Sequence, residues 1–316
     1  MNITGVESIT YGCRDIETAT RFLTDLGFVP VDDDSAGATH RLPDNSTVTL
    51  LPAGDPSLPP APDEGDTAHE LIWGVADADA LQAIAAELSR DRDVRDGNDG
   101  VLRVSDDLGH ALSFRVSTRE PLSLEPPATN TPGNRPRRNQ RAEGTEVRVP
   151  GLRRMAHVGY WAPGEVDASK SFYVDRLGFR ETEYIKGIGV FLRAGGSHEH
   201  HDLFLARRGD RCGFQHASYE VRDFDEVMLL GSHMEAQGWE THFGPGRHIF
   251  GSNIFWYLWH PAGAMLEITA DLDWIDDSWE LRYHETLPKS AGSWIARRID
   301  GKRMLYRTRE QDIIIE

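Results

Sequence analysis

Two stretches of this 316-residue chain resemble each other, and this duplication constrains the fold more than any other feature of the sequence. Residues 16–28 (IETATRFLTDLGF) and residues 166–179 (VDASKSFYVDRLGF) space their apolar residues at helical intervals, and both end at Leu-Gly-Phe. Glycine at this place suits the left-handed residue that follows a helix C-terminus. The chain is therefore predicted to contain copies of one supersecondary unit.

Each predicted helix lies within a longer repeating pattern. A short strand precedes the helix, at 8–11 and 156–160, and strand-like segments such as 189–193 and 202–205 follow it. The pattern occurs a second time in the C-terminal half. This copy comprises a strand at 216–221, a helix from about 224 to 238, and strands at 253–259 and 264–269 joined by the turn 260–263. This unit predicts an α+β fold, in which four βαβββ modules pair into two barrel-like domains.

Length and proline content divide the chain. A length of 316 residues favours two domains. Residues 116–150 contain six prolines, few large apolar residues and an arginine run at 135–141, and they read as a solvated linker. The predicted parts are a domain at 1–115, the linker at 116–150, a second domain at 151–285 and a C-terminal tail at 286–316.

Composition excludes several functions. A net charge of −17 argues against binding to nucleic acid, because the surface repels phosphates. No stretch is apolar enough to cross a membrane, and no secretory signal is visible. Cys13 and Cys212 cannot form a disulfide framework or a four-thiolate zinc site, so a cytoplasmic location is expected.

Histidines are concentrated in the second half, with three of the 13 before residue 150 and ten after it. His157 and His216 lie in the first strands of the third and fourth modules, and Glu267 lies in the last strand of the fourth. Two imidazoles and one carboxylate are the facial triad of non-haem Fe(II) enzymes that use O2. The alternative is that these are ordinary polar residues on half-buried strands. Glu267 favours the metal site, because its alternation with Met265 and Thr269 points it inward and a buried carboxylate needs a partner.

The segment 248–267 (HIFGSNIFWYLWHPAGAMLE) resembles the signature of the type I extradiol catechol dioxygenases, which belong to the vicinal oxygen chelate superfamily. The preceding Phe-Gly-Pro-Gly-Arg at 243–247 also resembles this family. The resemblance covers roughly 5–115 and 151–285 and is strongest in the C-terminal half. Trp256 and His260 depart from the usual pattern, without replacing a ligand.

The resemblance implies a role for each matching residue. His157, His216 and Glu267 would hold Fe(II), or less often Mn(II). His201 would be the acid–base histidine, with His200 as a competing choice because adjacent strand residues face opposite ways. His248 and Tyr257 would contact the substrate oxygens. The implied reaction inserts both atoms of O2 into a catechol next to the diol and gives a muconic semialdehyde-type product.

The N-terminal half departs from the ligand pattern. Ser8 falls at the place of His157, Glu70 at the place of His216, and Ser113 at the place of Glu267. These residues are not a three-ligand iron site, so we expect no iron in residues 1–115. His69, beside Glu70, is expected to be structural or exposed, and His198 and His200 are expected to be exposed loop residues.

Substrate and assembly are less constrained by the sequence. Phe243 occupies the place where relatives acting on acidic catechols can carry an arginine, which favours a neutral or hydrophobic catechol. Aromatic residues that line either the pocket or the core are Phe191, Phe250, Phe255 and Trp256. The resemblance also implies a homo-oligomer, a dimer or a tetramer. The alternatives are another metal-dependent enzyme of the superfamily, of glyoxalase or epimerase type, and a binding protein that traps an aromatic molecule without turnover.

Overall fold

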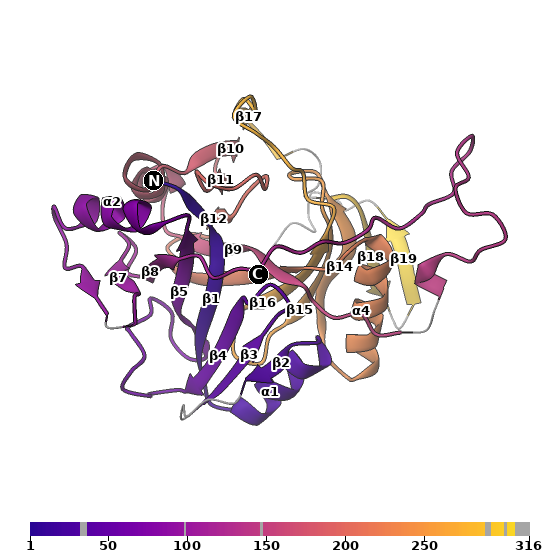
Figure 1. Cartoon of the computed structure of the whole chain (residues 1–316), viewed down its shortest axis with the longest axis horizontal. Helices are drawn as coiled ribbons and strands as arrows, with labels where there is room; N and C mark the ends of the chain where they lie inside the picture. The colour runs from indigo at the N-terminus through magenta and orange to yellow at the C-terminus, as the bar shows by residue number, and fades with distance from the viewer. Residues whose placement is uncertain (32–36, 98, 146–147, 288–291, 300–301, 307–316) are drawn as a thin grey trace.

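The computed structural model describes residues 1–31, 37–97, 99–145, 148–287, 292–299 and 302–306, arranged as two mixed β-sheets with few helices (Figure 1). Each sheet contains two βαβββ modules. The predicted α+β class is therefore confirmed.

The first sheet has eight strands in the order β2-β3-β4-β1-β5-β8-β7-β6. Antiparallel pairing of β1 with β5 joins its two modules, and within each module the first and last strands are parallel. The first module contains β1 (Ile3–Cys13), α1 (Ile16–Asp25), β2 (Val29–Val31), β3 (Ala38–Arg41) and β4 (Thr47–Pro52). The second contains β5 (Thr67–Val75), α2 (Ala78–Leu88), β6 (Arg95–Asp96), β7 (Leu102–Ser105) and β8 (Ala111–Val116).

The second sheet repeats this arrangement, with β9 and β13 at the centre. The third module contains β9 (Arg154–Ala162), α3 (Val166–Ser171), a π-helical turn (Phe172–Arg176), β10 (Arg180–Ile185), β11 (Gly189–Arg193) and β12 (Leu203–Arg207). The fourth contains β13 (Gly213–Glu220), α4 (Phe224–Ala236), β14 (Thr241–His248), β15 (Ile254–Trp259) and β16 (Met265–Ala270).

Three further strands extend the second sheet at its two edges. β17 (Arg282–His284) pairs with β10, while β18 (Gly292–Ile299) and β19 (Lys302–Tyr306) continue the sheet beyond β14. Within the predicted tail, the described residues 292–299 and 302–306 are thus strands of this sheet.

The helices begin where the sequence provides a side-chain cap. The carboxylates of Asp15, Asp77 and Asp223 accept backbone N–H groups in the first turns of α1, α2 and α4. The helix predicted at 166–179 divides instead into α3 and the π-helical turn. Residues 166–179 contain one residue more than 16–28, and the wider turn takes up that extra residue.

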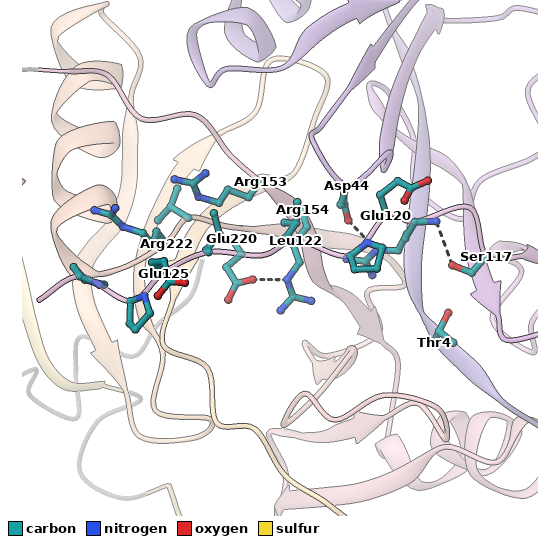
Figure 2. Close-up of a pocket in the computed structure, with 16 residues that line it drawn as sticks. Thr4, Asp44, Ser117, Glu120, Leu122, Glu125, Arg153, Arg154, Glu220 and Arg222 are labelled. Carbon is teal, nitrogen blue, oxygen red and sulfur yellow. Dashed lines mark hydrogen bonds and ion pairs between the residues drawn. The ribbon is translucent and has the colours of Figure 1, made fainter. Parts of the chain in front are cut away.

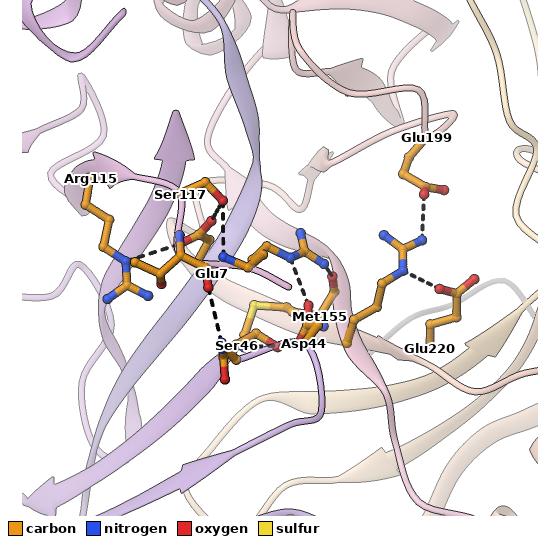
Figure 3. Close-up of polar contacts among 12 residues, drawn as sticks. Glu7, Asp44, Ser46, Arg115, Ser117, Met155, Glu199 and Glu220 are labelled. Atoms are coloured by element: carbon orange, nitrogen blue, oxygen red, sulfur yellow. Dashed lines mark hydrogen bonds and ion pairs between the residues drawn. The ribbon is translucent and has the colours of Figure 1, made fainter. Parts of the chain in front are cut away.

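One hydrophobic core includes residues of both sheets, and a buried polar contact also joins them. The Arg119 guanidinium donates to Asp44 Oδ2 at 2.8 Å and to the carbonyl oxygen of Met155 at 2.9 Å. Ser46, which hydrogen-bonds Asp44, accepts the Met155 N–H (Figure 3). Because Met155 lies two residues before His157 on β9, this contact holds the strand that carries a predicted metal ligand.

His260, one of the departures from the family signature, is also a contact between the two sheets. Its ring stacks on Tyr11 with centroids 4.8 Å apart and meets the edge of Phe22 at 4.9 Å. Trp256, the other departure, is fully buried against Gly231 of α4, and it therefore belongs to the core and not to a substrate pocket.

The segment between β8 and β9 contains a single described helical turn, the 3-10 turn Glu143–Thr145, and its arginine run is mostly exposed. Its first part lines a groove of about 600 Å³ beside the start of β9 and the end of β13 (Figure 2). Arg153, Arg154 and Arg222 line this groove and already have carboxylate partners in Glu226, Glu220 and Asp223. None of the six predicted site residues lines it.

Among the described residues, no helix has the length and apolar character needed to cross a membrane.

Candidate metal centre and surrounding residues

Three neighbouring strands bring His157, His216 and Glu267 together. In the sheet register, His157 on β9 and Glu267 on β16 both lie opposite Ser218 of β13. His216 lies two residues from Ser218 and thus on the same face of β13. Their ligand atoms all lie within 4.8 Å of one another, and all three side chains are buried. This is the one group of three potential metal ligands among the residues that the structure describes.

The protonation states of His216 and Glu267 suit a divalent cation. Burial, with His157 nearby, lowers the pKa of His216 to about 3, so its imidazole is neutral. Its Nδ1 donates to Gln215 Oε1 at 2.9 Å, which leaves Nε2 with a free electron pair. That buried Nε2 has no hydrogen-bond partner among the described residues, and Glu267 Oε2 lies 3.8 Å from it. The donor set and this uncompensated atom fit Fe(II) or Mn(II).

Glu267 is held as a carboxylate. Burial alone would raise its pKa, but His157 and His248 outweigh burial and hold the pKa well below its usual range. Its Oε2 lies 3.0 Å from His157 Nε2. Its Oε1 accepts a hydrogen bond from Asn253 Nδ2 at 3.1 Å, and the same amide lies 2.8 Å from Thr269 Oγ1. Asn253 thus orients the carboxylate.

His248 and Tyr257 lie on the other side of Glu267. His248 Nε2 is 3.3 Å from the Tyr257 hydroxyl and 3.6 Å from Glu267 Oε1. The His248 ring stacks on Phe255, with centroids 3.9 Å apart. Burial and the Glu267 carboxylate raise the pKa of Tyr257 well above its usual value, so its hydroxyl keeps its proton and can donate it.

His201 lies on the opposite side of the cluster, with its ring centroid 4.2 Å from that of His157. Burial, with His157 and His200 nearby, lowers its pKa well below the usual value. His200 points away towards Glu183, whose Oε1 lies 3.3 Å from His200 Nε2. The expectation that His200 is an exposed loop residue is wrong, because its side chain is completely buried. His198 is exposed, as expected.

The segment after β16 explains why His200 is buried. The carbonyl oxygen of Asp273 accepts the His200 N–H at 2.8 Å, and the Trp279 ring lies edge-on to the His200 ring at 5.5 Å. This segment then forms β17 beside β10. Residues 273–284 thus cover this side of the candidate site.

Aromatic rings surround the six predicted residues on two sides. Phe191 contacts His201 at 4.9 Å between centroids and stacks on Phe204 and Phe250. Phe243 stacks on Phe255 and lies 6.1 Å from Tyr257. These rings are apolar surfaces next to the polar cluster.

Comparison with known proteins agrees with this geometry. Residues 154–268, which contain all six predicted site residues, match the model of the Glyoxalase/Bleomycin resistance protein/Dioxygenase superfamily. This part of the chain is thus similar to that superfamily. The match confirms the family resemblance in the C-terminal half.

One curated protein is similar to this chain in sequence. The chain is 31% identical over 185 residues to "Metapyrocatechase 2" of Cupriavidus necator, an alignment that covers 58% of this chain and 56% of the relative. The chain thus spans about half the length of the curated relative that it matches.

Solved structures share the fold over most of the chain. A Mn(II)-bound glyoxalase from Novosphingobium aromaticivorans has a TM-score of 0.73 and 20% identity, covering 93% of this chain and 91% of that one. The 2,2',3-trihydroxybiphenyl 1,2-dioxygenase of Sphingomonas wittichii has a TM-score of 0.69 and 17% identity, covering 93% and 98%. The homoprotocatechuate 2,3-dioxygenase of Brevibacterium fuscum has a TM-score of 0.69 and 18% identity, covering 92% and 88%.

The first sheet has different residues at the places that correspond to His157, His216 and Glu267. Ser8 and Ser113 both lie opposite Ile72 in the register, as His157 and Glu267 lie opposite Ser218. Glu70 Oε1 accepts hydrogen bonds from Ser113 Oγ at 2.6 Å and from Arg103 Nε at 3.1 Å. The carboxylate in the first sheet is therefore neutralised by a guanidinium.

Four residues that surround the candidate site were not predicted from the sequence: Gln215, Asn253, Gly159 and Glu183. A Cβ at Gly159 would clash with Gln215 Oε1 and with His216 Nδ1, so glycine is needed there for His216 to fit. The pairing of Gly159 with His216 across β9 and β13 is the signal that could have identified Gly159. Asn253 lies inside the segment 248–267, but the signature gives it no role, and Glu183 lies in a segment without a pattern that points to the site.

Proposed function

We propose that this protein is an extradiol ring-cleaving dioxygenase, which inserts both atoms of O2 into a catechol-type aromatic next to its diol. The observation that carries the proposal is the arrangement of His201 on one side of the His157, His216 and Glu267 cluster and of His248 with Tyr257 on the other. A cluster that only stored or trapped a metal would not need acid–base groups on both sides.

The metal is proposed to be Fe(II), with Mn(II) as the alternative, held by His157, His216 and Glu267. When bound, such an ion supplies Lewis-acid activation of the adjacent catechol oxygens and an electron for O2. Both ions accept two imidazoles and a carboxylate, and the residues around the ligands decide between them.

The remaining residues are proposed to bind the diol and to move its protons. Tyr257 keeps its proton and can donate a hydrogen bond to a catechol oxygen, while His248 beside it can donate or accept one. His201 is neutral and can take a proton from the second hydroxyl and return it to oxygen when the ring opens. Burial of all three ligands keeps bulk water away from these steps.

A neutral or hydrophobic catechol is the proposed substrate class. Phe191 beside His201 and Phe243 beside Tyr257 offer apolar surfaces on both sides of the polar cluster. A carboxylated catechol would have its charge desolvated against these rings, which is costly.

Oxygen consumption by freshly Fe(II)-reconstituted protein tests the proposal. The substrates are catechol, 3- and 4-alkyl catechols, aryl catechols and a carboxylated catechol, assayed in air with spectrophotometric detection. We expect a yellow ring-opened product, with one O2 consumed for each catechol. Glu267→Ala is the matched variant and should abolish turnover. A metal-loaded wild type that is inert towards every catechol, or an undiminished rate in Glu267→Ala, refutes the proposal.

The fold shared with a Mn(II)-bound glyoxalase favours a second candidate, a non-oxidative metal-dependent reaction. The same assay separates the two. An inert protein that binds one metal per chain would favour isomerase-type chemistry, whereas a chain that binds no metal would favour a binding protein.

We also propose that the protein forms a homo-oligomer, a dimer or a tetramer, and that it is located in the cytoplasm, as expected from the sequence. Light scattering after size-exclusion chromatography tests the first, since a mass of 35.4 kDa in solution would correspond to a monomer. Fractionation of the producing cells tests the second.

A further inference from the structure

A row of polar side chains leads from His201 away from the metal cluster. His201 Nδ1 lies 3.0 Å from His200 Nδ1, His200 Nε2 lies 3.3 Å from Glu183 Oε1, and Glu183 Oε2 lies 2.7 Å from His284 Nε2. His200, His201 and Glu183 are all buried, while His284 is half-buried. The family signature used above includes only His201 from this row.

The fold brings these residues together from distant parts of the chain. Glu183 lies on β10 and His284 on β17, which pairs with β10 in parallel. The Asp273 carbonyl oxygen and the Trp279 ring fix the position of His200. Arg282 is a further charged group at this end of the row, with Nη1 3.9 Å from Glu183 Oε1.

The ionised Glu183 decides where the protons of this row lie. Burial raises the pKa of Glu183, but His200 and His284 outweigh burial and bring the pKa below its usual value. A carboxylate can only accept hydrogen bonds. His200 Nε2 makes no hydrogen bond of standard geometry among the described residues, and Glu183 Oε1 at 3.3 Å is the acceptor that faces it, so a neutral His200 is assigned its proton on Nε2.

The tautomer of His201 follows from that of His200. With its proton on Nε2, a neutral His200 presents an unprotonated Nδ1 to His201. Because His201 Nδ1 faces this nitrogen at 3.0 Å, His201 Nδ1 must donate. A neutral His201 with its proton on Nδ1 has an unprotonated Nε2.

We propose that Glu183 and His200 are positioning residues that fix His201 in the Nδ1–H tautomer, so that its Nε2 is free to accept a proton from the substrate. This inference rests on the proposed function, because it gives a role to the acid–base histidine of that reaction. In the proton step, the O–H bond of the catechol hydroxyl breaks and an N–H bond forms at His201 Nε2. The positive charge formed there is balanced by Glu183 through His200.

Two substitutions at His200 separate this role from simple packing. His200→Leu removes the acceptor that faces His201 Nδ1. His200→Asn keeps an acceptor, because the amide oxygen of asparagine occupies nearly the place of the histidine Nδ1. The matched control is His198→Leu, which changes an exposed histidine two residues away.

The first readout is the tautomer itself, which does not depend on turnover. Long-range 1H–15N correlation spectra of the full-length chain, labelled with 15N-histidine and loaded with diamagnetic Zn(II), give the protonated nitrogen of each histidine, and a His201→Asn spectrum assigns His201. We expect the Nδ1–H form in the wild type, His200→Asn and His198→Leu. We expect an Nε2–H form or a mixture in His200→Leu.

The second readout is steady-state cleavage of the best catechol by the Fe(II)-loaded proteins. We expect kcat to fall about 10- to 100-fold in His200→Leu with little change in KM, since removing a group that orients a functional histidine typically has this effect. His200→Asn should recover kcat to within about threefold of the wild type, and His198→Leu should match the wild type.

The outcomes distinguish this inference from the proposed function. An Nε2–H tautomer in the wild type, or an unchanged Nδ1–H tautomer in His200→Leu, overturns the role of His200. If the expected tautomers appear but no catechol is cleaved by any protein, the proposed function fails and the role of Glu183 and His200 in fixing the tautomer remains.

Discussion

Replacing Asn253 by alanine should weaken metal binding without unfolding the protein. Asn253 is completely buried, and its amide is the hydrogen-bond donor that holds Glu267 Oε1, at 3.1 Å. The same amide also donates to Thr269 Oγ1 at 2.8 Å, and Thr269 lies on the strand that carries Glu267. Alanine removes both contacts and leaves the carboxylate free to turn towards His248.

The size of the effect follows from the kind of contact that is lost. A hydrogen bond to a charged group contributes roughly 1.5–3 kcal/mol. Losing a residue that orients a metal ligand typically costs about 10- to 100-fold in affinity, which corresponds to about 1.4–2.7 kcal/mol. The two estimates agree, so we expect the dissociation constant for Fe(II) or Mn(II) to rise by one to two orders of magnitude.

Competition with a chromogenic chelator, under anaerobic conditions for Fe(II), measures this dissociation constant. The control is Ser113→Ala, which removes a hydrogen bond to Glu70 in the equivalent strand of the first sheet and should leave metal affinity unchanged. The reasoning is refuted if Asn253→Ala, with an unchanged content of secondary structure, binds metal as tightly as the wild type. It is equally refuted if Ser113→Ala weakens binding as much.

Three further changes test other parts of the structure. Gly159→Ala should lower metal affinity at least about tenfold, because the added methyl group displaces His216 and Gln215, and the same chelator titration measures this. Arg119→Met should lower the free energy of unfolding by about 3 kcal/mol, because it leaves Asp44 buried without its cation. The control, Arg90→Met, breaks an exposed ion pair and should lower the free energy of unfolding by less than about 1 kcal/mol. Urea unfolding measures both. Burial lowers the pKa of His260 from 6.5 to about 3. Between these two pH values the unfolded chain binds a proton at this histidine that the folded chain does not bind. The stability present above pH 6.5 is therefore lost as the pH falls towards 3. Urea unfolding of the metal-free protein measures the free energy of unfolding between pH 6.5 and 4.5. The slope of this free energy against pH should be smaller in His260→Phe by about 1.4 kcal/mol per pH unit, and equal slopes in the two proteins would contradict the lowered pKa of His260.

The fold could be predicted because its information is repeated in the sequence. The two Leu-Gly-Phe helix ends mark equivalent places in the first and third modules, and the alternation around Glu267 indicates a strand with one inward face. The π-helical turn at Phe172–Arg176 could not be predicted from periodicity, because a single inserted residue leaves the apolar spacing almost unchanged.

Residues around the candidate ligands were harder to predict, because their contacts depend on distant parts of the chain. His200 was expected to be exposed because its own neighbours, Gly-Gly-Ser-His-Glu, are typical of a loop. Its burial comes from Asp273 and Trp279, which follow the last module. Nothing in the local sequence indicates that a later segment returns to cover this loop.

A comparison of Glu70 in the first sheet with Glu267 in the second shows why only the second sheet has a candidate metal site among the described residues. Both sheets place a carboxylate among three neighbouring strands with the same register. In the first sheet, Arg103 lies 3.1 Å from Glu70 and supplies the positive charge that the carboxylate needs. In the second, the neighbours of Glu267 include His216, which its lowered pKa keeps neutral, and Glu267 itself stays ionised. His157 and His248 compensate for this buried carboxylate, and a divalent ion held by His157, His216 and Glu267 would take over that compensation. A divalent ion would therefore stabilise the second sheet at a place where the first sheet already has Arg103.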